Sequence, residues 1–198
     1  MYRVALYLIA GWSGLFVMGI ELLGGRVLAP YFGSSIYVWG ALITVFMLAL
    51  SLGYLCGGRA SMHSPSLRRL SVILVGAALA TLPVLLLGEP LLDYLSSVLT
   101  DPRFGSLCAA SLLFFAPTLI SGMVSPYAIR LLVADQASAG QRAGLLYFAS
   151  TFGSAAGTIA TSFYLVLWLE VNQILLLLMG ISVLVSLGAW LLSARNDE

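Results

Sequence analysis

Lysine is absent from this sequence, and charge of either sign is scarce, because charged residues make up only 9% of its 198 positions. The nine arginines are spread along the chain and form no basic run or tail, which excludes nucleic acid as a partner. With 61% hydrophobic residues and a mean hydropathy of +1.04, the chain has too little polar surface for a soluble domain. The sequence therefore predicts a polytopic membrane protein.

Residues that could bind metals or cofactors are also few. His63 is the one histidine and lies between two apolar runs, so no imidazole is available inside the membrane for haem or a metal. Cys56 is expected near the cytoplasmic end of the second helix and Cys108 near the outer end of the fourth, so the two thiols are too far apart for a disulfide. The sequence contains neither a G-x-G-x-x-G motif nor a cluster of acidic residues. We therefore expect no cofactor and assign no catalytic residue.

The apolar runs predict an all-α fold. They lack the alternation of barrel strands, and only helices satisfy every backbone group within one spanning segment. Each run is long enough to cross a hydrocarbon core of about 30 Å. We expect one transmembrane domain over residues 1–198, with six helices at about 4–29, 37–58, 69–88, 104–125, 143–168 and 172–194.

The distribution of arginine predicts the orientation, because cytoplasmic loops are enriched in this residue. With six crossings and a cytoplasmic N-terminus, most arginines fall on the cytoplasmic side, and the C-terminus returns there. The expected location is the cell inner membrane. The first helix imitates a signal peptide, but Glu21, Arg26 and Pro30 argue that it is retained.

A more polar stretch separates the third and fourth expected spans. Its leucines recur at helical spacing, and Pro90 and Pro102 are suited to start and stop a short helix. We expect an interfacial helix at about 90–101, either as a surface connector or as a lid over an external opening.

Two short motifs suggest an internal repeat. "GGRVLAPY" ends the first helix and "SGMVSPY" ends the fourth, so the two copies would face opposite sides of the membrane. This arrangement is typical of the inverted repeats of secondary transporters. Small residues at four-residue spacing mark close helix contacts, at Ala149, Gly153, Gly157 and Thr161 and again at Gly53 and Gly57.

Glu21 is the candidate substrate-binding residue, because an intramembrane carboxylate must be paired, hydrated or protonated. We expect it to lie a few ångströms inside the outer boundary, with Tyr31, Tyr37 and Trp39 as aromatic walls that attract ammonium groups. The alternative is a hydrogen bond that fixes helix packing. Arg26 points to another helical face and is expected to reach the outer headgroups.

Four segments together resemble one known family: "GIELLGGRVLAPYFGSSIYVWGALI", "LGYLCGGR", "SGMVSPYAIRL" and "AGLLYFASTFGSAAGT". They are similar, in order and spacing, to the membrane domain of the membrane-bound spermidine synthase-like proteins. The resemblance implies a soluble aminopropyltransferase domain after the last helix, but these 198 residues contain no such domain. A weaker likeness is to half of a major facilitator transporter, although the aspartate of that superfamily's loop signature is missing.

The resemblance implies a membrane module that docks or serves a cytoplasmic aminopropyltransferase-like partner, with polyamines as the associated chemistry. The expected docking residues are the arginines of the cytoplasmic side, namely Arg59, Arg68, Arg69, Arg130 and Arg142. Two alternatives stay open. The first is an autonomous transporter of a small amine or lipid-like solute, which would be a homodimer. The second is a structural subunit of a larger membrane complex. The lipid bilayer is a partner in every case.

Overall fold

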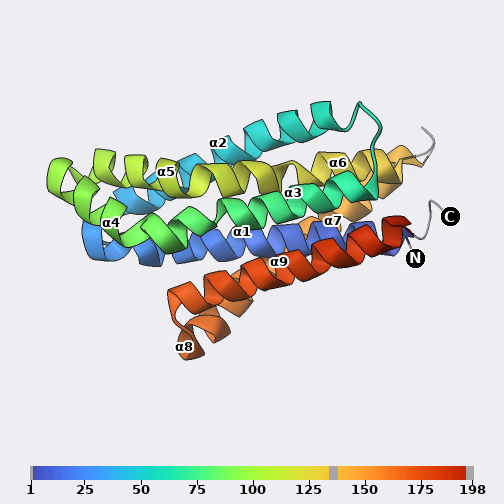
Figure 1. The fold of residues 1–198 in the computed structure, drawn as a ribbon. Coiled ribbons are helices and arrows are strands. Elements are labelled where there is room, and N and C mark those ends of the chain that lie inside the picture. Colours follow the sequence, from blue (N-terminus) through green and yellow to red (C-terminus); the bar gives the residue numbers. More distant parts are fainter. Residues whose placement is uncertain (1, 134–137, 195–198) are drawn as a thin grey trace.

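The computed structural model describes residues 2–133 and 138–194, and every regular element in them is a helix (Figure 1). The all-α prediction is therefore confirmed for the described residues. The helices are α1 (Tyr2–Phe32), α2 (Ile36–Ala60), α3 (Leu67–Ala80), α4 (Leu82–Val98), α5 (Pro102–Gly122), α6 (Val124–Leu132), α7 (Ala139–Ile159), the π-helix η1 (Ala160–Leu165), α8 (Val166–Trp168) and α9 (Val171–Ala194).

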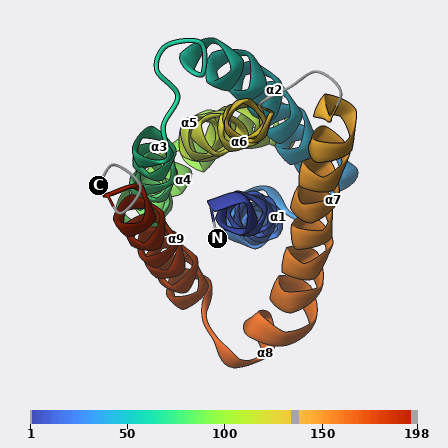
Figure 2. The same cartoon turned by 90° about the vertical axis from the view of Figure 1, so that its right-hand side faces the viewer.

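The helices form an elongated bundle. Tyr2 begins α1 and Ala194 ends α9 at the same end of this bundle, which we call the terminal end (Figure 1). The connections α1–α2 and α4–α5 lie at the opposite end, which we call the far end. Seen from the terminal end, the other long helices surround α1 (Figure 2). This position explains why α1 has an apolar sequence with no clear polar face, since a helix surrounded by protein must be apolar on every side.

Within residues 2–133 and 138–194, five helical segments are long and apolar enough to cross a membrane, as expected of a membrane protein. Two of these segments each comprise two consecutive helices, α3 with α4 and α5 with α6. The five are Tyr2–Phe32, Ile36–Ala60, Leu67–Val98, Pro102–Leu132 and Val171–Ala194. The sixth expected span, 143–168, lies within the helical stretch from Ala139 to Trp168, but its glycines, serines and threonines make it less apolar and η1 interrupts it.

The expected separate helix at 90–101 is instead the second half of α4, which runs without interruption from Leu82 to Val98. Pro90 does not start a new helix, because Leu92 and Leu95 bury their side chains in the same hydrophobic core as the first half. The break in this segment lies earlier, at Thr81, whose hydroxyl donates a 3.0 Å hydrogen bond to the Ala77 carbonyl. Pro83 explains the break, since it cannot donate a hydrogen bond to the carbonyl four residues before it.

A second break separates α5 from α6 at Met123. Pro126 follows it and, by the same reasoning, leaves the Gly122 carbonyl without its helical partner. The helix nevertheless continues beyond this proline to Leu132. The motif "SGMVSPY" spans this break, whereas "GGRVLAPY" lies entirely within α1, so the two copies differ in local structure. The inverted repeat stays a prediction.

Both predicted ladders of small residues lie where two helix backbones approach closely. A Cβ atom added at Gly153 would overlap the Gly11 carbonyl oxygen, and one added at Gly157 would overlap the backbone of Leu15. Gly53 and Gly57 of α2 meet the backbone of Leu119 and Met123 in the same way. The absence of side chains at these glycines therefore allows α7 to pack against α1, and α2 against the α5–α6 segment.

We expect Gly153→Ala to destabilise the protein by roughly 1–3 kcal/mol, because the added methyl group forces α1 and α7 apart. Gly144→Ala is the matched control on the same helix, since a Cβ at Gly144 meets no atom within 4 Å. Thermal unfolding in detergent should show a lower Tm for Gly153→Ala only. Equal Tm values for the two variants would contradict the close contact.

Candidate functional site

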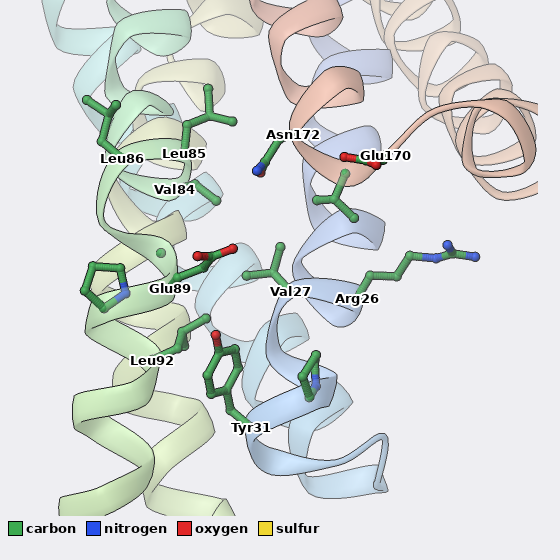
Figure 3. Close-up of a pocket in the computed structure, with 14 residues that line it drawn as sticks. Arg26, Val27, Tyr31, Val84, Leu85, Leu86, Glu89, Leu92, Glu170 and Asn172 are labelled. Carbon is green, nitrogen blue, oxygen red and sulfur yellow. The ribbon is translucent and has the colours of Figure 1, made fainter.

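The main candidate site is a cavity toward the far end of the bundle, between the end of α1, the middle of α4 and the start of α9 (Figure 3). Its volume is about 390 Å³, which lies in the usual range of small-molecule sites. The lining residues are Arg26, Val27, Pro30 and Tyr31 of α1, then Val84, Leu85, Leu86, Gly88, Glu89, Pro90 and Leu92 of α4, and lastly Glu170, Val171 and Asn172.

Polar groups from three helices converge on this cavity. The Glu89 carboxylate points into the space between α4 and α1, and the Tyr31 hydroxyl lies on the same side (Figure 3). Glu170 and Asn172 line the cavity from the connection before α9 and from its first turn. The connection is held by the backbone N–H of Glu170, which donates a 3.0 Å hydrogen bond to the side-chain oxygen of Gln173.

The cavity has an excess of negative charge. Glu89 and Glu170 are both exposed, and Asp93 follows Glu89 by one helical turn, close enough for both carboxylates to act electrostatically on Tyr31. Arg26 lies at the edge, but its side chain extends away from Glu89 and Tyr31 (Figure 3). In the described residues, no salt bridge neutralises either glutamate. We call this site the acidic cavity, and its chemistry suits a small cation.

Glu21, the candidate from the sequence, lies elsewhere. It is half-buried on α1, lines none of the cavities described here, and makes no hydrogen bond or ion pair with any described residue. The predicted packing hydrogen bond is thus not formed within the described residues.

The three predicted aromatic residues are also separated. Tyr31 lines the acidic cavity, but Trp39 packs against α1 at Gly25 and lines a different cavity. Tyr37 already makes a cation–π contact within the chain, because the Arg103 guanidinium lies 4.6 Å from the centre of its ring. The expected site of one carboxylate with three aromatic walls is therefore not assembled.

Sequence reasoning missed Glu89, Glu170 and Asn172 as site residues. Glu89 and Glu170 are far apart in the sequence, and neither belongs to a recognisable motif. The available signal in the sequence is that Glu89, Asp93, Asp101 and Glu170 all lie in connections between apolar runs, which indicates an acidic surface but not a cavity.

Four of the five predicted docking arginines are exposed, and all five belong to segments at the terminal end. Several of them have partners within the chain. Arg68 lies over the Trp190 ring at 4.1 Å, Arg69 donates to the His63 carbonyl, and Arg142 donates to the Leu132 carbonyl at 2.6 Å. Arg59 and Arg130 are exposed near the ends of α2 and α6.

A small polar cavity of about 80 Å³ lies beside the α5–α6 break. Serine hydroxyls surround it, and that of Ser121 is buried without a hydrogen-bond partner. The serines come from α1, α5, α6 and α7, namely Ser13, Ser121, Ser125, Ser150 and Ser154. The cavity is large enough for ordered water, which can satisfy the hydroxyl groups and the carbonyls left free by Pro126.

In the part of the chain that the structure describes, no group of three or more histidine, cysteine, aspartate or glutamate side chains is placed to hold a metal ion. Cys56 and Cys108 are both free thiols. Comparisons of the chain with protein-family models, with curated proteins and with solved structures found no match.

Because Glu21 has no partner among the described residues, we expect Glu21→Gln to change the free energy of unfolding by less than about 0.5 kcal/mol. Trp12→Phe is the comparison on the same helix, since it removes the 2.9 Å hydrogen bond from the indole N–H to Ser182. That loss should cost about 0.5–1.5 kcal/mol. Thermal unfolding in detergent measures both, and a larger loss for Glu21→Gln would show that Glu21 fixes the packing.

Proposed function

We propose that this protein is a six-span membrane protein of the cell inner membrane that binds a small amine in the acidic cavity, from the non-cytoplasmic side. The observation that carries this proposal is that Glu89 and Glu170 line one cavity of about 390 Å³, with the Arg26 side chain extended away from Glu89. An ammonium group suits such a site, because the carboxylates attract its charge and the Tyr31 hydroxyl and Asn172 amide accept its N–H groups.

Two carboxylates favour an amine with more than one charge. A single intramembrane carboxylate such as Glu21 compensates one ammonium group only, whereas Glu89 and Glu170 together compensate two. The apolar residues that line the same cavity, such as Val27 and Val84, suit the methylene groups that separate the charges of a polyamine.

The resemblance to membrane-bound spermidine synthase-like proteins supports the same class of ligand. The segment "GGRVLAPY", which is part of that resemblance, supplies four residues of the cavity lining. An amine-binding membrane domain would then supply or sense polyamines beside an aminopropyltransferase-like enzyme. As an autonomous protein it would transport the amine.

Six crossings with both termini in the cytoplasm agree with the charges of the chain. Most exposed arginines of the described residues lie at the terminal end, with Arg26 and Arg103 as the exceptions. Glu89, Asp93, Asp101 and Glu170 lie in segments toward the far end. The stretch from Ala139 to Trp168 runs from the terminal end toward the far end beside α1 (Figure 1). As a sixth crossing it would return α9 to the cytoplasmic side.

Topology can be tested with single cysteines in a Cys56→Ser, Cys108→Ser background. Met62→Cys in the α2–α3 connection and Ser97→Cys at the end of α4 are both exposed positions at opposite ends. An impermeant thiol reagent added to intact cells should label Ser97→Cys only, and should label Met62→Cys after permeabilisation. Labelling of both positions in intact cells would contradict this topology.

Amine binding can be tested with spermidine as the probe and isothermal titration calorimetry of the protein in nanodiscs. We expect the Glu89→Gln, Glu170→Gln double variant to bind spermidine at least about tenfold more weakly, a loss of at least about 1.4 kcal/mol. Higher ionic strength should weaken binding by the wild type. Glu21→Gln is the matched control and should bind like the wild type. No binding by the wild type, or equal binding by the double variant, would refute the proposal.

A second candidate function is docking of a cytoplasmic aminopropyltransferase-like protein at the terminal end. The exposed guanidinium groups of Arg59 and Arg130 favour it, because they can meet an acidic surface on a partner. The simpler explanation for arginines at these positions is that they set the orientation of the chain in the membrane.

Docking predicts that Arg59→Gln with Arg130→Gln lowers the recovery of a soluble partner in a pull-down from native membranes. Arg68 and Arg69 are poorer choices for this test, because their substitution also removes contacts within the chain. Arg103→Gln, at the far end, is the control and should leave recovery unchanged. Recovery of no soluble nucleotide-binding protein with the wild type would rule docking out.

A further inference from the structure

A second cavity lies on the other side of the far part of α1, between α1, the start of α2 and the π-helix η1. Its volume is about 370 Å³. Most of its surface is apolar, and one cationic side chain lines it. The lining residues are Leu22, Gly25, Arg26, Ala29, Ser34, Trp39, Thr161, Ser162 and Val166. We call it the η1 cavity.

Arg26 gives this cavity its charge. The residue lines both cavities, but its side chain extends away from Glu89 and Tyr31 of the acidic cavity (Figure 3). The side chain is exposed, and no carboxylate among the described residues forms a salt bridge with it. Its guanidinium group is therefore available to an external anion, and its planar set of donors matches a phosphate in geometry.

Thr161 and Ser34, which both carry hydroxyl groups, line the η1 cavity together with Arg26. The Thr161 side chain is 1% exposed, and its hydroxyl lies toward Gly19 of α1 and makes no hydrogen bond within the protein. Buried hydroxyls are rarely left unsatisfied, and rotation of the Thr161 side chain toward a polar ligand or water in the cavity would satisfy this group.

The backbone of η1 is itself unusual. Residues 160–165 form a π-helix between α7 and α8, and Thr161 lies in its first turn. Such π-helical turns are rare and occur frequently at functional sites. On the opposite wall, the Trp39 indole lies directly against α1, because Gly25 has no side chain there. One wall of the cavity is thus the Trp39 indole, and the opposite wall is the π-helical backbone of η1.

The depth of Arg26 brings its side chain within reach of lipid headgroups. The 31 residues of α1 extend over about 46 Å at 1.5 Å per residue, and Arg26 lies about 9 Å before the end of this helix. A bilayer measures about 30 Å across its hydrocarbon core and 40–45 Å with its headgroups. With α1 centred in the bilayer, Arg26 lies about 14 Å from the midplane, at the boundary between the hydrocarbon core and the headgroups. Its side chain can therefore reach a lipid phosphate, with the apolar residues Leu22 and Val166 available to an acyl chain.

We propose that the η1 cavity binds an anionic phospholipid, whose phosphate is held by Arg26 and by the Thr161 and Ser34 hydroxyls, while an acyl chain packs on Leu22, Trp39 and Val166. This site lies on another side of α1 than the acidic cavity, and the proposal does not rest on the proposed amine binding there. Phosphate and guanidinium form a charge-assisted pair, and the apolar walls select an amphiphile over a free phosphate.

Native mass spectrometry of the delipidated full chain provides the test, with phosphatidylglycerol and phosphatidylcholine titrated separately. The wild type should bind one phosphatidylglycerol at least tenfold more tightly than phosphatidylcholine. Arg26→Gln should remove this preference, and Thr161→Val should weaken phosphatidylglycerol binding severalfold while leaving the charge unchanged. Arg103→Gln is the control, because Arg103 is also exposed toward the far end but rests on Tyr37.

Equal binding of the two lipids by the wild type, or an equal loss in Arg103→Gln and Arg26→Gln, would overturn the proposal. Displacement of the lipid by millimolar inorganic phosphate would show a free-phosphate site and overturn the assignment to a lipid. If Arg26→Gln fails to fold, Arg26→Lys serves instead, because it keeps the charge and loses the planar donor set. Arg26→Lys should retain part of the preference for phosphatidylglycerol over phosphatidylcholine. If Thr161→Val binds phosphatidylglycerol as tightly as the wild type does, the site is also refuted.

Discussion

The close backbone contact between α1 and α7 is the constraint on which the rest of the bundle depends. Lipid chains are as apolar as leucine side chains, so helices in a bilayer gain little from the hydrophobic effect and associate through close packing. Gly11 and Gly14 of α1 provide this packing together with Gly153 and Gly157 of α7. A Cβ atom at Gly14, Gly153 or Gly157 would overlap the opposite backbone and separate the two helices, whereas one at Gly11 would only make a tight contact.

The same contact explains how the chain closes around α1. Once α7 is held against α1, the connection through η1 and α8 places α9 on another side of the same helix. There the Trp12 indole donates its hydrogen bond to Ser182 of α9. The α5 helix and the α2 helix that packs on it cover the remaining side, where Phe46 and Phe114 lie in contact with each other inside the core. The position of α1 at the centre thus follows from contacts made on all its faces.

Much of this arrangement was predictable from the sequence, because it depends on local patterns. Apolar runs without alternation predicted helices, and glycines at four-residue spacing marked the close contacts of α7 and α2. The breaks at Thr81 and Met123 were missed, since a proline can be tolerated within a helix, as Pro90 is in α4, or can disrupt the preceding turn, as Pro83 does. Only the tertiary contacts of the flanking residues decide between these outcomes.

The candidate site was predictable only in part. Tyr31 was expected to line a site at Glu21 and lines the acidic cavity instead. Glu21 was favoured as the carboxylate because it is the acidic residue deepest in an apolar run. The position of a residue within an apolar run does not reveal which helices meet at the far end. Glu89 and Glu170 line one cavity because α4 and the start of α9 lie on the same side of α1, an arrangement that depends on the packing described above.

Arg26 connects the two cavities, because it is the one residue that lines both of them among the described residues. If its side chain turned toward Glu89 and Glu170, it would compete with an amine for the two carboxylates. An anionic lipid that holds the guanidinium on the η1 side would remove this competitor. The two proposed ligands would then favour each other's binding, and thermodynamic linkage requires the effect to be reciprocal. The composition of the lipid leaflet at the far end would thereby influence the affinity of the acidic cavity without any movement of the helices.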